Sequence, residues 1–341
     1  MKAAVFHGPR DVRIEDVPDP AAPAADEVVL RVIRAAICGT DSSEWDHGPI
    51  LCRPGVVLGH EFVGRVVEAG AGVTDMRVGD RVVSGAGISC GHCFWCVRRR
   101  TNLCAEYRTL GLQVDGGLAE YVTSPASICR LVPDACDDDA AAMTQPLAVA
   151  LHALSRVAQA PDETVAVIGA GGIGSFLVAG ASRRAVEGRV VAVDIEADRL
   201  ATASALGANE TVDATGRDLS DLLLERSGGV GFDIVIEASG APTAPSAAIA
   251  GARRGGRVLL VGLHGAPQEL DLTGTIVREI DIVTTVAHVC DTDIPAALEL
   301  LAETDVATVT AGSRISLETL VEEGLLPLAE RRAPGKILVT P

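Results

Sequence analysis

Four cysteines with short spacing are the densest chemical signal in the chain. Cys90, Cys93, Cys96 and Cys104 follow the pattern C-x2-C-x2-C-x7-C. Four thiolates so close in sequence can complete a tetrahedron around Zn²⁺, and such a closed shell leaves no position for a substrate. The length of the chain and the tight clustering favour metal over disulfides. The spacing therefore predicts a structural zinc lobe over residues 90–104, in which His92 is not needed as a ligand.

A second set of possible metal ligands is dispersed. Cys38 follows a strand-like run and begins the sequence CGTD, and Gly59-His60-Glu61 follows the apolar run Pro54–Leu58. A thiolate, an imidazole and a carboxylate are ligand types of a catalytic zinc that keeps one position for water or substrate. Spacing alone leaves this open, because Cys38 is equally well explained as a buried small residue and His60 as a turn histidine.

A glycine motif between two apolar runs predicts a dinucleotide site. Val165–Ile168 suits a strand buried on both faces, and a proline-free segment after the glycines suits a helix. In such a motif Gly169 allows a tight turn, Gly171 lets the backbone approach a pyrophosphate, and Gly174 lets helix and strand pack closely. The phosphates then lie at the positive helix N-terminus. The residues predicted to bind the cofactor here are Gly169, Gly171, Gly172, Ile173, Gly174 and Asp194.

Asp194 ends the second apolar run and bears on which dinucleotide binds. Its carboxylate would accept hydrogen bonds from ribose hydroxyls and repel a 2′-phosphate. Arg199 could reach a phosphate, or could pair in solvent with Asp198 or Glu196. Asp194 therefore favours NAD over NADP, and Arg199 is a further candidate for cofactor binding.

Two patterns of secondary structure position these residues. Up to about residue 148, short apolar runs punctuated by Gly, Pro and Asp predict a small all-β architecture. From about 149 to 287, strands and helices alternate, which predicts a doubly wound parallel sheet. The tail is expected to be helical over Ile294–Glu303 and Leu317–Glu323 and to end in a strand over Lys336–Val339. Three acids followed by three alanines, at 137–142, are typical of a helix start.

Composition excludes several kinds of partner. The 341 residues carry 29 basic and 46 acidic side chains, and the net charge of −17 argues against nucleic acid or an anionic membrane. No apolar run approaches the ~20 residues that span a bilayer. The N-terminus becomes charged too early for a secretion signal. The sequence therefore predicts a soluble, cytoplasmic protein of two domains.

Taken together, these motifs resemble those of the zinc-containing medium-chain dehydrogenases, the alcohol dehydrogenase superfamily, over essentially the whole chain. The polyol, threonine and butanediol dehydrogenase branch is the most similar, since its members carry Glu after the His. The resemblance implies an α/β fold, with a GroES-like β-rich catalytic domain (1–148 and 288–341) and an inserted Rossmann domain (149–287). The matching segments are ICGTD (37–41), GHEFVGRVVEAGAGV (59–73), VGDRV (78–82), the four-cysteine lobe, GGLAEY (116–121), PLAVALHAL (146–154), VIGAGGIG (167–174) and GKILV (335–339).

The same resemblance implies roles for single residues. Cys38 and His60 would ligate a catalytic zinc, and Glu61 would be a ligand or exchange with water. Thr40 would receive the alcohol proton, while zinc acts as a Lewis acid and hydride passes to the nicotinamide. One catalytic and one structural zinc are expected per subunit. Gly240 and Gly262 follow predicted strands at the carboxyl edge of the sheet, where a cofactor binds in such folds.

One departure from the branch concerns the metal. The branch usually has Glu-Pro where this chain has Gln145-Pro146, and a neutral amide oxygen suits zinc less well than a carboxylate. Our hypothesis is that Gln145 hydrogen-bonds a substrate hydroxyl and that Glu61 binds zinc directly.

A second departure concerns the proton path and the substrate loop. Relatives often place His five positions after the zinc cysteine, where this chain has Ser43, which can relay a proton only through water. His47 could substitute, although a solvated loop histidine is the simpler interpretation. Trp45 and Leu51 lie in the segment that shapes the substrate pocket in relatives, but core packing explains them equally well.

These observations predict a zinc-dependent NAD(H) oxidoreductase that interconverts a secondary alcohol (a polyol, sugar, cyclitol or small hydroxy compound) and its ketone. One alternative is a biosynthetic ketone reductase of the same fold. Another is a zinc- and nucleotide-binding protein without turnover, for which Gln145 and Ser43 leave room. A zinc-free quinone or enone reductase is disfavoured, because such enzymes lack Cys38, His60 and the four-cysteine lobe. By resemblance, a homo-oligomer is expected, with a tetramer favoured over a dimer.

Overall fold

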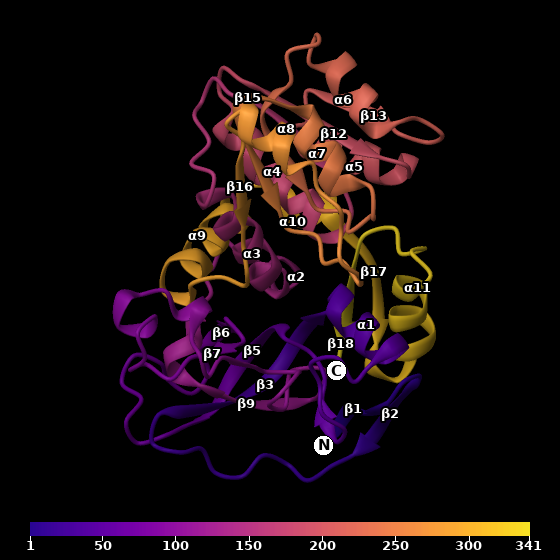
Figure 1. The fold of residues 1–341 in the computed structure, drawn as a ribbon. Helices are drawn as coiled ribbons and strands as arrows, with labels where there is room; N and C mark the ends of the chain where they lie inside the picture. The colour runs from indigo at the N-terminus through magenta and orange to yellow at the C-terminus, as the bar shows by residue number, and fades with distance from the viewer. The chain divides into compact units, whose positions relative to one another are not determined.

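The computed structural model describes all residues from Met1 to Pro341, which form two compact units. Met1–Ala148 and Ala287–Pro341 make the first unit, and Val149–Val286 make the second. Figure 1 shows both ends of the chain, coloured indigo and yellow, within the first unit. The middle of the sequence is therefore an insertion, after which the chain returns to complete the first unit. No helix in either unit combines the length and apolar character needed to cross a bilayer.

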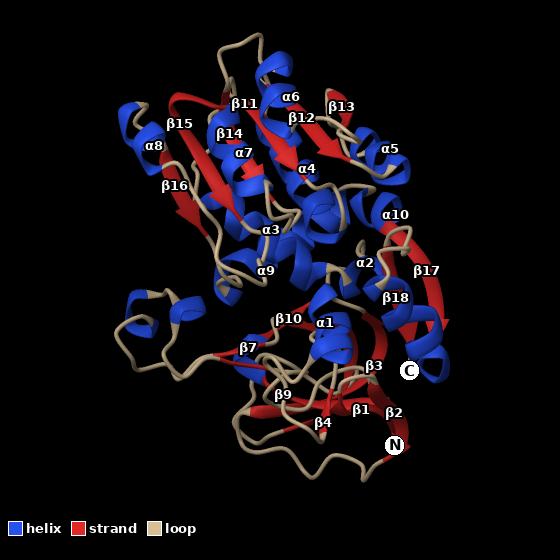
Figure 2. Ribbon diagram, turned by 45° about the vertical axis from the view of Figure 1, so that its right-hand side comes forward, coloured by secondary structure: helices blue, strands red, loops and turns tan.

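The first unit is mostly β-structure (Figure 2). Its strands are β1 (Lys2–Gly8), β2 (Asp11–Asp16), β3 (Glu27–Ala36), β4 (Val56–Val57), β5 (Glu61–Ala69), β6 (Arg81–Ser84), β7 (Gly87–Ile88), β8 (Arg108–Thr109), β9 (Tyr121–Pro125), β10 (Cys129–Leu131), β17 (Ala311–Ser316) and β18 (Lys336–Thr340). Its helices are α1 (Gly39–His47), α2 (Asp138–Ala142), the start of α3 (Thr144–Ser155), α9 (Cys290–Glu303), α10 (Val306–Thr310) and α11 (Leu326–Ala329). Shorter helical turns are η1 (Cys96–Arg98), η2 (Thr101–Leu103), η3 (Ala126–Ile128), η4 (Leu317–Thr319) and η5 (Leu320–Leu325).

Strand β3 is the centre of the first unit. It lies in a seven-stranded sheet of order β10-β6-β5-β3-β18-β17, and β9 also pairs with it. At its end, Ala36 lies opposite Glu61 of β5 on one side and Leu338 of β18 on the other. The strand predicted at Lys336–Val339 is therefore confirmed. This pairing places the last strand of the chain one strand away from the start of β5.

The second unit is a parallel sheet of six strands in the order β13-β12-β11-β14-β15-β16. The Rossmann sheet predicted from strand–helix alternation is confirmed. Because β12 lies on one side of β11 and β14 on the other, the strand order reverses at β11, which is where such sheets bind ligands. The elements are β11 (Thr164–Ile168), α4 (Gly172–Arg184), β12 (Arg189–Asp194), α5 (Ala197–Ala205), β13 (Glu210–Asp213), α6 (Leu219–Arg226), β14 (Phe232–Glu237), α7 (Ala244–Gly251), β15 (Ala252–Leu260), α8 (Leu272–Val277) and β16 (Asp281–Thr284).

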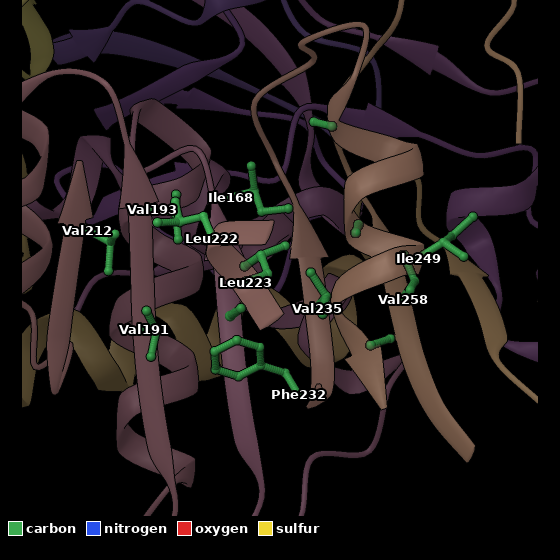
Figure 3. Packing of buried hydrophobic residues seen from close by; sticks show 14 of the residues in the cluster. Ile168, Val191, Val193, Val212, Leu222, Leu223, Phe232, Val235, Ile249 and Val258 are labelled. Atoms are coloured by element: carbon green, nitrogen blue, oxygen red, sulfur yellow. The ribbon is translucent and has the colours of Figure 1, made fainter. Parts of the chain in front are cut away.

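Branched aliphatic side chains fill the core of this sheet (Figure 3). Alternate residues of each strand point to the same face, so one face of the sheet gathers the side chains that α6 and α7 cover. Strands buried on both faces appear in sequence as continuous apolar runs, which is why these strands were predictable. The labelled members of this cluster are Ile168, Val191, Val193, Val212, Leu222, Leu223, Phe232, Val235, Ile249 and Val258.

Strand β11 leads into α4 through the glycine motif. Gly169 has φ of +89°, in the left-handed region that favours glycine. A Cβ on Gly174 would lie 1.8 Å from the carbonyl oxygen of Gly169, so α4 packs against this turn at backbone distance. A Cβ on Gly171 would meet nothing nearer than the Arg199 guanidinium at 3.8 Å. The fold therefore requires Gly174 but tolerates a side chain at position 171.

Two predicted helices differ from the structure. The segment predicted as a helix at Leu317–Glu323 is a 3-10 turn followed by a π-helix. Gly324, whose Cβ would lie 2.5 Å from Ile37, and Pro327 just beyond it weaken a regular α-helix here. Helix α9 begins at Cys290 and not at Ile294, and the Asp293 carboxylate in its first turn accepts the N–H of Val289, the residue before the helix, at 2.7 Å.

The acidic run before α2 is a helix start, as predicted. Asp137 is the N-cap residue, and its carboxylate accepts the Ala140 N–H at 2.8 Å. Asp138 pairs with Arg81 at 2.7 Å, and Asp139 pairs with Arg34 at 2.7 Å and with a second arginine on β17. These acids therefore tie α2 to three strands of the first unit.

The glycine geometry predicts opposite outcomes for two neighbouring substitutions. Gly174→Ala should lower the free energy of unfolding by about 2–3 kcal/mol, because the new methyl group overlaps a backbone carbonyl that cannot move away alone. Gly171→Ala, the matched control, should cost at most about 1 kcal/mol, since it meets open space at an N-cap position. Urea denaturation of the two variants measures the difference. Equal losses of stability would contradict the close packing of α4 on the turn.

Candidate metal centres and dinucleotide site

The four cysteines of the predicted lobe converge. The sulfur atoms of Cys90, Cys93, Cys96 and Cys104 all lie within 4.8 Å of one another. Cys93 Sγ lies 3.5 Å from Cys96 Sγ, and Cys90 Sγ lies 4.0 Å from it. The segment runs between β7 and β8, whose short pairing closes the base of the lobe. Four sulfur donors at this separation match the donor set of a closed zinc shell.

Backbone N–H groups surround these sulfurs. The amides of Cys90 and Glu106 each lie 3.3 Å from Cys104 Sγ. N–H groups of Cys96 and Ala105 lower the pKa of Cys93 to about 6, which favours its thiolate form. His92 is 77% exposed, and its Nδ1 contacts the carbonyl oxygen of Cys90 at 2.7 Å. One of its ring nitrogens also lies within 4.8 Å of Cys90 Sγ and of a Glu106 carboxylate oxygen, but the four sulfurs form a complete set of ligands without it.

The dispersed candidates also meet. One ligand atom each from Cys38, His60 and Glu61 lies within 4.8 Å of the others, and His60 and Glu61 are buried. Cys38 is the residue before α1, while His60 and Glu61 stand at the start of β5. Gly59 makes the turn possible, since its φ is +99° and a Cβ there would lie 2.5 Å from the Leu118 amide nitrogen. The structure therefore places a thiol, an imidazole and a carboxylate together, which fits Zn²⁺.

Asp41 supports this centre and was not singled out from the sequence. Its Oδ2 accepts the Cys38 N–H at 2.9 Å, and its Oδ1 lies 3.6 Å from His60 Nδ1. At 3.6 Å this is an ionic contact and not a hydrogen bond. A carboxylate on the Nδ1 side of the ring would leave the other nitrogen, Nε2, for a metal. Burial raises the pKa of Asp41. At His60 burial acts to lower the pKa, but Asp41, Cys38 and Glu61 together outweigh it and raise the pKa to about 10. The position of an acid within CGTD was the available signal.

Lys336 is the second residue that the sequence interpretation missed. Its Nζ lies 2.7 Å from Glu61 Oε1 and 2.5 Å from Oε2. Burial acts to lower the pKa of Lys336, but the charges of Glu61, Cys38 and Asp41 and the hydrogen bond to Glu61 together outweigh burial and raise it. The segment GKILV contains this lysine, but nothing in the linear sequence indicates that it contacts Glu61.

The remaining candidates of the first unit lie on helices. Thr40 Oγ1 is 3.6 Å from Cys38 Sγ, while Ser43 is exposed on α1. Gln145 is half-buried in the first turn of α3. Trp45 is 4% exposed, with the Arg10 guanidinium 4.6 Å from its ring centroid. The indole therefore packs beneath Arg10.

His47 and Leu51 lie near the end of α1 and beyond it. His47 is 73% exposed, and its Nδ1 lies 3.2 Å from Asp46 Oδ2, as expected of a solvated histidine. Leu51 is 51% exposed, and its amide donates to the buried carboxylate of Glu44 at 2.6 Å. Glu44 therefore fixes the backbone of the loop that presents the Leu51 side chain to solvent.

In the second unit, Asp194 ends β12 beside the glycine turn. Its Oδ2 accepts the Ala170 N–H at 2.7 Å, and its Oδ1 accepts the N–H groups of Ile195 and Glu196. Arg199 Nη1 lies 3.8 Å from Asp194 Oδ1. The carboxylate therefore organises the turn between β11 and α4, and an arginine stands next to it.

Gly240 and Gly262 meet at the carboxyl ends of β14 and β15. A Cβ on Gly262 would lie 2.6 Å from the Gly240 amide nitrogen and 2.4 Å from Glu237 Oε2. Glu237, which is fully buried, accepts the N–H groups of Ser239 and Gly240 through Oε1. His264 Nε2 lies 3.3 Å from its other oxygen. Sequence reasoning missed Glu237, which joins the two loops.

Comparison with known proteins agrees with this arrangement. The model of the alcohol dehydrogenase GroES-like domain matches residues 24–134, and that of zinc-binding dehydrogenases matches residues 172–303. Sorbitol dehydrogenase of Bacillus subtilis (strain 168) is 33% identical over 288 residues, which cover 83% of this chain and 81% of the relative.

Solved structures show the same relationship. The 2R,3R-butanediol dehydrogenase from Bacillus subtilis has a TM-score of 0.90 at 30% identity, over 100% of this chain and 99% of that one. A zinc-binding dehydrogenase from Sinorhizobium meliloti 1021, solved bound to NADP, has a TM-score of 0.91 at 31% identity, with coverage of 100% and 99%. The chain therefore belongs to the zinc-type medium-chain alcohol dehydrogenase family, and it is an oxidoreductase of that type.

Proposed function

We propose that this protein is a zinc-dependent NAD(H) oxidoreductase that interconverts a secondary hydroxyl of a polyol or small hydroxy compound and the corresponding ketone. The observation that carries the proposal is the meeting of Cys38, His60 and Glu61 within 4.8 Å, in the unit that also holds the four-cysteine lobe. The substrate class is supported by the sorbitol and butanediol dehydrogenases to which the chain is similar.

The residues around this centre are proposed to have separate roles in metal binding and proton transfer. Zinc, when bound, supplies Lewis-acid activation of the hydroxyl oxygen. Cys38, His60 and Glu61 would hold it, and the Asp41 carboxylate, whose Oδ1 lies 3.6 Å from His60 Nδ1, would help to orient the ring by electrostatic attraction. Thr40, adjacent to Cys38, would receive the hydroxyl proton.

Two further residues deal with proton release and with substrate. Ser43 is exposed and would pass the proton to water without storing it, because a hydroxyl does not titrate near neutral pH. The Gln145 amide would hydrogen-bond a second hydroxyl of the substrate. A neutral amide can both donate and accept, which suits a polyol with several hydroxyl groups.

The lobe is proposed to hold a second, structural zinc. Its four sulfurs complete a tetrahedral shell, so it has no open position for chemistry. Each chain would then carry one catalytic and one structural zinc.

The proposed cofactor preference is for NAD. Asp194 places a carboxylate at the end of β12, where it would repel a 2′-phosphate. Arg199 stands 3.8 Å from that carboxylate and would partly offset the repulsion. The balance favours NAD, because Asp194 is 7% exposed and held by three backbone N–H groups.

We also propose a homo-oligomer, with the edge strand β16 as one contact. This strand pairs only with β15, so its other edge is open to a second strand. Exposed apolar side chains lie on it and on α8, at Leu272, Ile276, Val277 and Ile282. An open strand edge beside apolar surface fits a second copy of this chain. A tetramer is favoured over a dimer by resemblance to the polyol dehydrogenase branch.

The activity and the cofactor preference are tested together. Initial rates with NAD should be highest on polyols and vicinal diols such as sorbitol and 2,3-butanediol. The kcat/KM for NAD should exceed that for NADP by about tenfold or more, from repulsion between Asp194 and the 2′-phosphate. Asp194→Ala should narrow this ratio. Absence of turnover in both directions across the panel would contradict the proposed activity. A higher kcat/KM for NADP than for NAD would contradict the proposed role of Asp194 in excluding a 2′-phosphate.

The ligand assignment is tested by zinc content. Glu61→Ala should reduce zinc from about two ions to about one per chain and lower kcat by at least about a hundredfold, because the catalytic shell loses a ligand. Gln145→Ala, the matched variant, should keep both ions and raise the KM for polyol. Elemental analysis alongside steady-state rates measures both effects. Loss of zinc in the glutamine variant alone would reverse the two roles.

The proposed oligomer contact is tested by one charge on the apolar face. Ile276→Asp should shift the protein to a smaller assembly, because burying an unpaired carboxylate in an interface is costly. Val230→Asp, at a position that is 70% exposed on a loop of the same unit, serves as control. Light scattering after size-exclusion chromatography gives the mass of each. An unchanged assembly in Ile276→Asp would place the interface elsewhere.

A further inference from the structure

Lysine is rare in this chain. Of the 29 basic residues other than histidine, only Lys2 and Lys336 are lysines, and all others are arginines. Lys2 is 47% exposed and lies 3.9 Å from Asp16. The Lys336 side chain is 9% exposed and Glu61, its partner, is fully buried. A buried cation in contact with a candidate metal ligand requires an explanation beyond surface solvation.

The register of the sheet explains how the two side chains meet. Ala36 of β3 lies between Glu61 of β5 and Leu338 of β18, so these three positions form one row across the strands. Directly opposed residues point to the same face, and Lys336 is two residues before Leu338, so it points to that face as well. Ala36 is fully buried and small, which leaves room for the lysine to reach across β3.

The contact uses the whole carboxylate. Nζ lies 2.7 Å from one oxygen of Glu61 and 2.5 Å from the other. The same carboxylate lies within 4.8 Å of the ligand atoms of Cys38 and His60. Glu61 therefore stands between a fixed cation and the place where a divalent cation would bind, and the two cations compete for its charge.

We propose that Lys336 is a positioning residue that shares the Glu61 carboxylate with the catalytic metal and so limits how strongly Glu61 binds that metal. This inference rests on the proposed zinc site of Cys38, His60 and Glu61. Removing the lysine charge leaves Glu61 as a stronger donor and removes a repulsive charge from the metal. The metal would then be held more tightly but would withdraw less electron density from the substrate.

A purely structural role for Lys336 predicts the reverse for the metal. If the lysine only stabilises the packing of β18 near β5, its loss would destabilise the sheet that carries Glu61, and the metal would dissociate faster. The direction of the change in metal retention therefore separates the two roles.

The experiment follows transfer of zinc from the loaded enzyme to a chromophoric chelator. Lys336→Met removes the charge and keeps most of the length, Lys336→Arg keeps the charge, and Lys2→Met is the control at the only other lysine. The zinc of the four-cysteine lobe serves as an internal standard. In Lys336→Met, the catalytic-site zinc should leave more slowly by about tenfold or more, and kcat should fall by about tenfold with the KM for NAD unchanged. Lys336→Arg and Lys2→Met should behave like the wild type.

A second arm tests whether the effect passes through Glu61. Glu61→Gln, unlike Glu61→Ala, keeps an oxygen that can bind zinc but loses the negative charge. In this background Lys336→Met should change zinc release much less than it does in the wild type, because the shared charge is already gone. Visible spectra of cobalt-loaded enzyme should also differ between Lys336→Met and the wild type, since a stronger carboxylate donor alters the ligand field.

The outcomes are distinguishable. Faster or unchanged release of the catalytic-site zinc in Lys336→Met overturns this inference and leaves the proposed function standing. An equal effect in the Glu61→Gln background overturns the route through Glu61. A wild-type enzyme that carries zinc only in the four-cysteine lobe overturns the proposed zinc site and this inference together.

Discussion

Burial of ionic groups at the end of β3 is the constraint on which the first unit depends. Asp41, His60, Glu61 and Lys336 are all withdrawn from water, a placement that costs several kcal/mol for each ion unless opposite charges and hydrogen bonds compensate it. Compensation requires three segments that are far apart in sequence to meet within a few ångströms. The pairing of β5 and β18 on the two sides of β3 brings Glu61 and Lys336 together, so the burial of these charges depends on the sheet.

In the second unit, the geometry of the expected cofactor site depends mainly on how closely backbone segments approach one another. Close approach of α4 to the β11 turn leaves no space for a side chain on Gly174. Two carboxylates at strand ends also shape these loops. Asp194 and Glu237 each accept loop N–H groups and so fix the turns around the expected cofactor position. The acid that a sequence motif assigns to the ribose is therefore also part of the scaffold of its own site.

Two neutral residues alter the electrostatics of the proposed reaction. Gln145 stands where the polyol dehydrogenase branch usually has a carboxylate, and Ser43 where relatives often have an imidazole. With one potential anion fewer, the charge of Lys336 would weigh more in the electrostatic balance around a bound metal. A site with less negative charge would withdraw more electron density from a hydroxyl bound to the metal.

The sequence by itself determined the local features of this protein. The four-cysteine lobe, the glycine turn and the apolar strands of the second unit were predictable because their residues are neighbours in sequence and their spacing reflects the geometry directly. The acidic run before α2 was predictable for the same reason, since an N-cap is a contact between residues three apart.

Only the tertiary structure decided which distant residues share a site. Lys336 meets Glu61 across 275 positions and Glu237 joins two loops, and neither contact leaves a periodic or spaced pattern in the sequence. The place of Asp41 within CGTD was a signal, but its contact with His60 could not be inferred from spacing. At the π-helical turn Leu320–Leu325 local sequence and tertiary packing act together: Gly324 and Pro327 weaken a regular α-helix, and close packing against Ile37 leaves no room for a side chain at position 324. The physical reason is common to all of them: strand pairing and core packing set these distances, and both are properties of the folded chain.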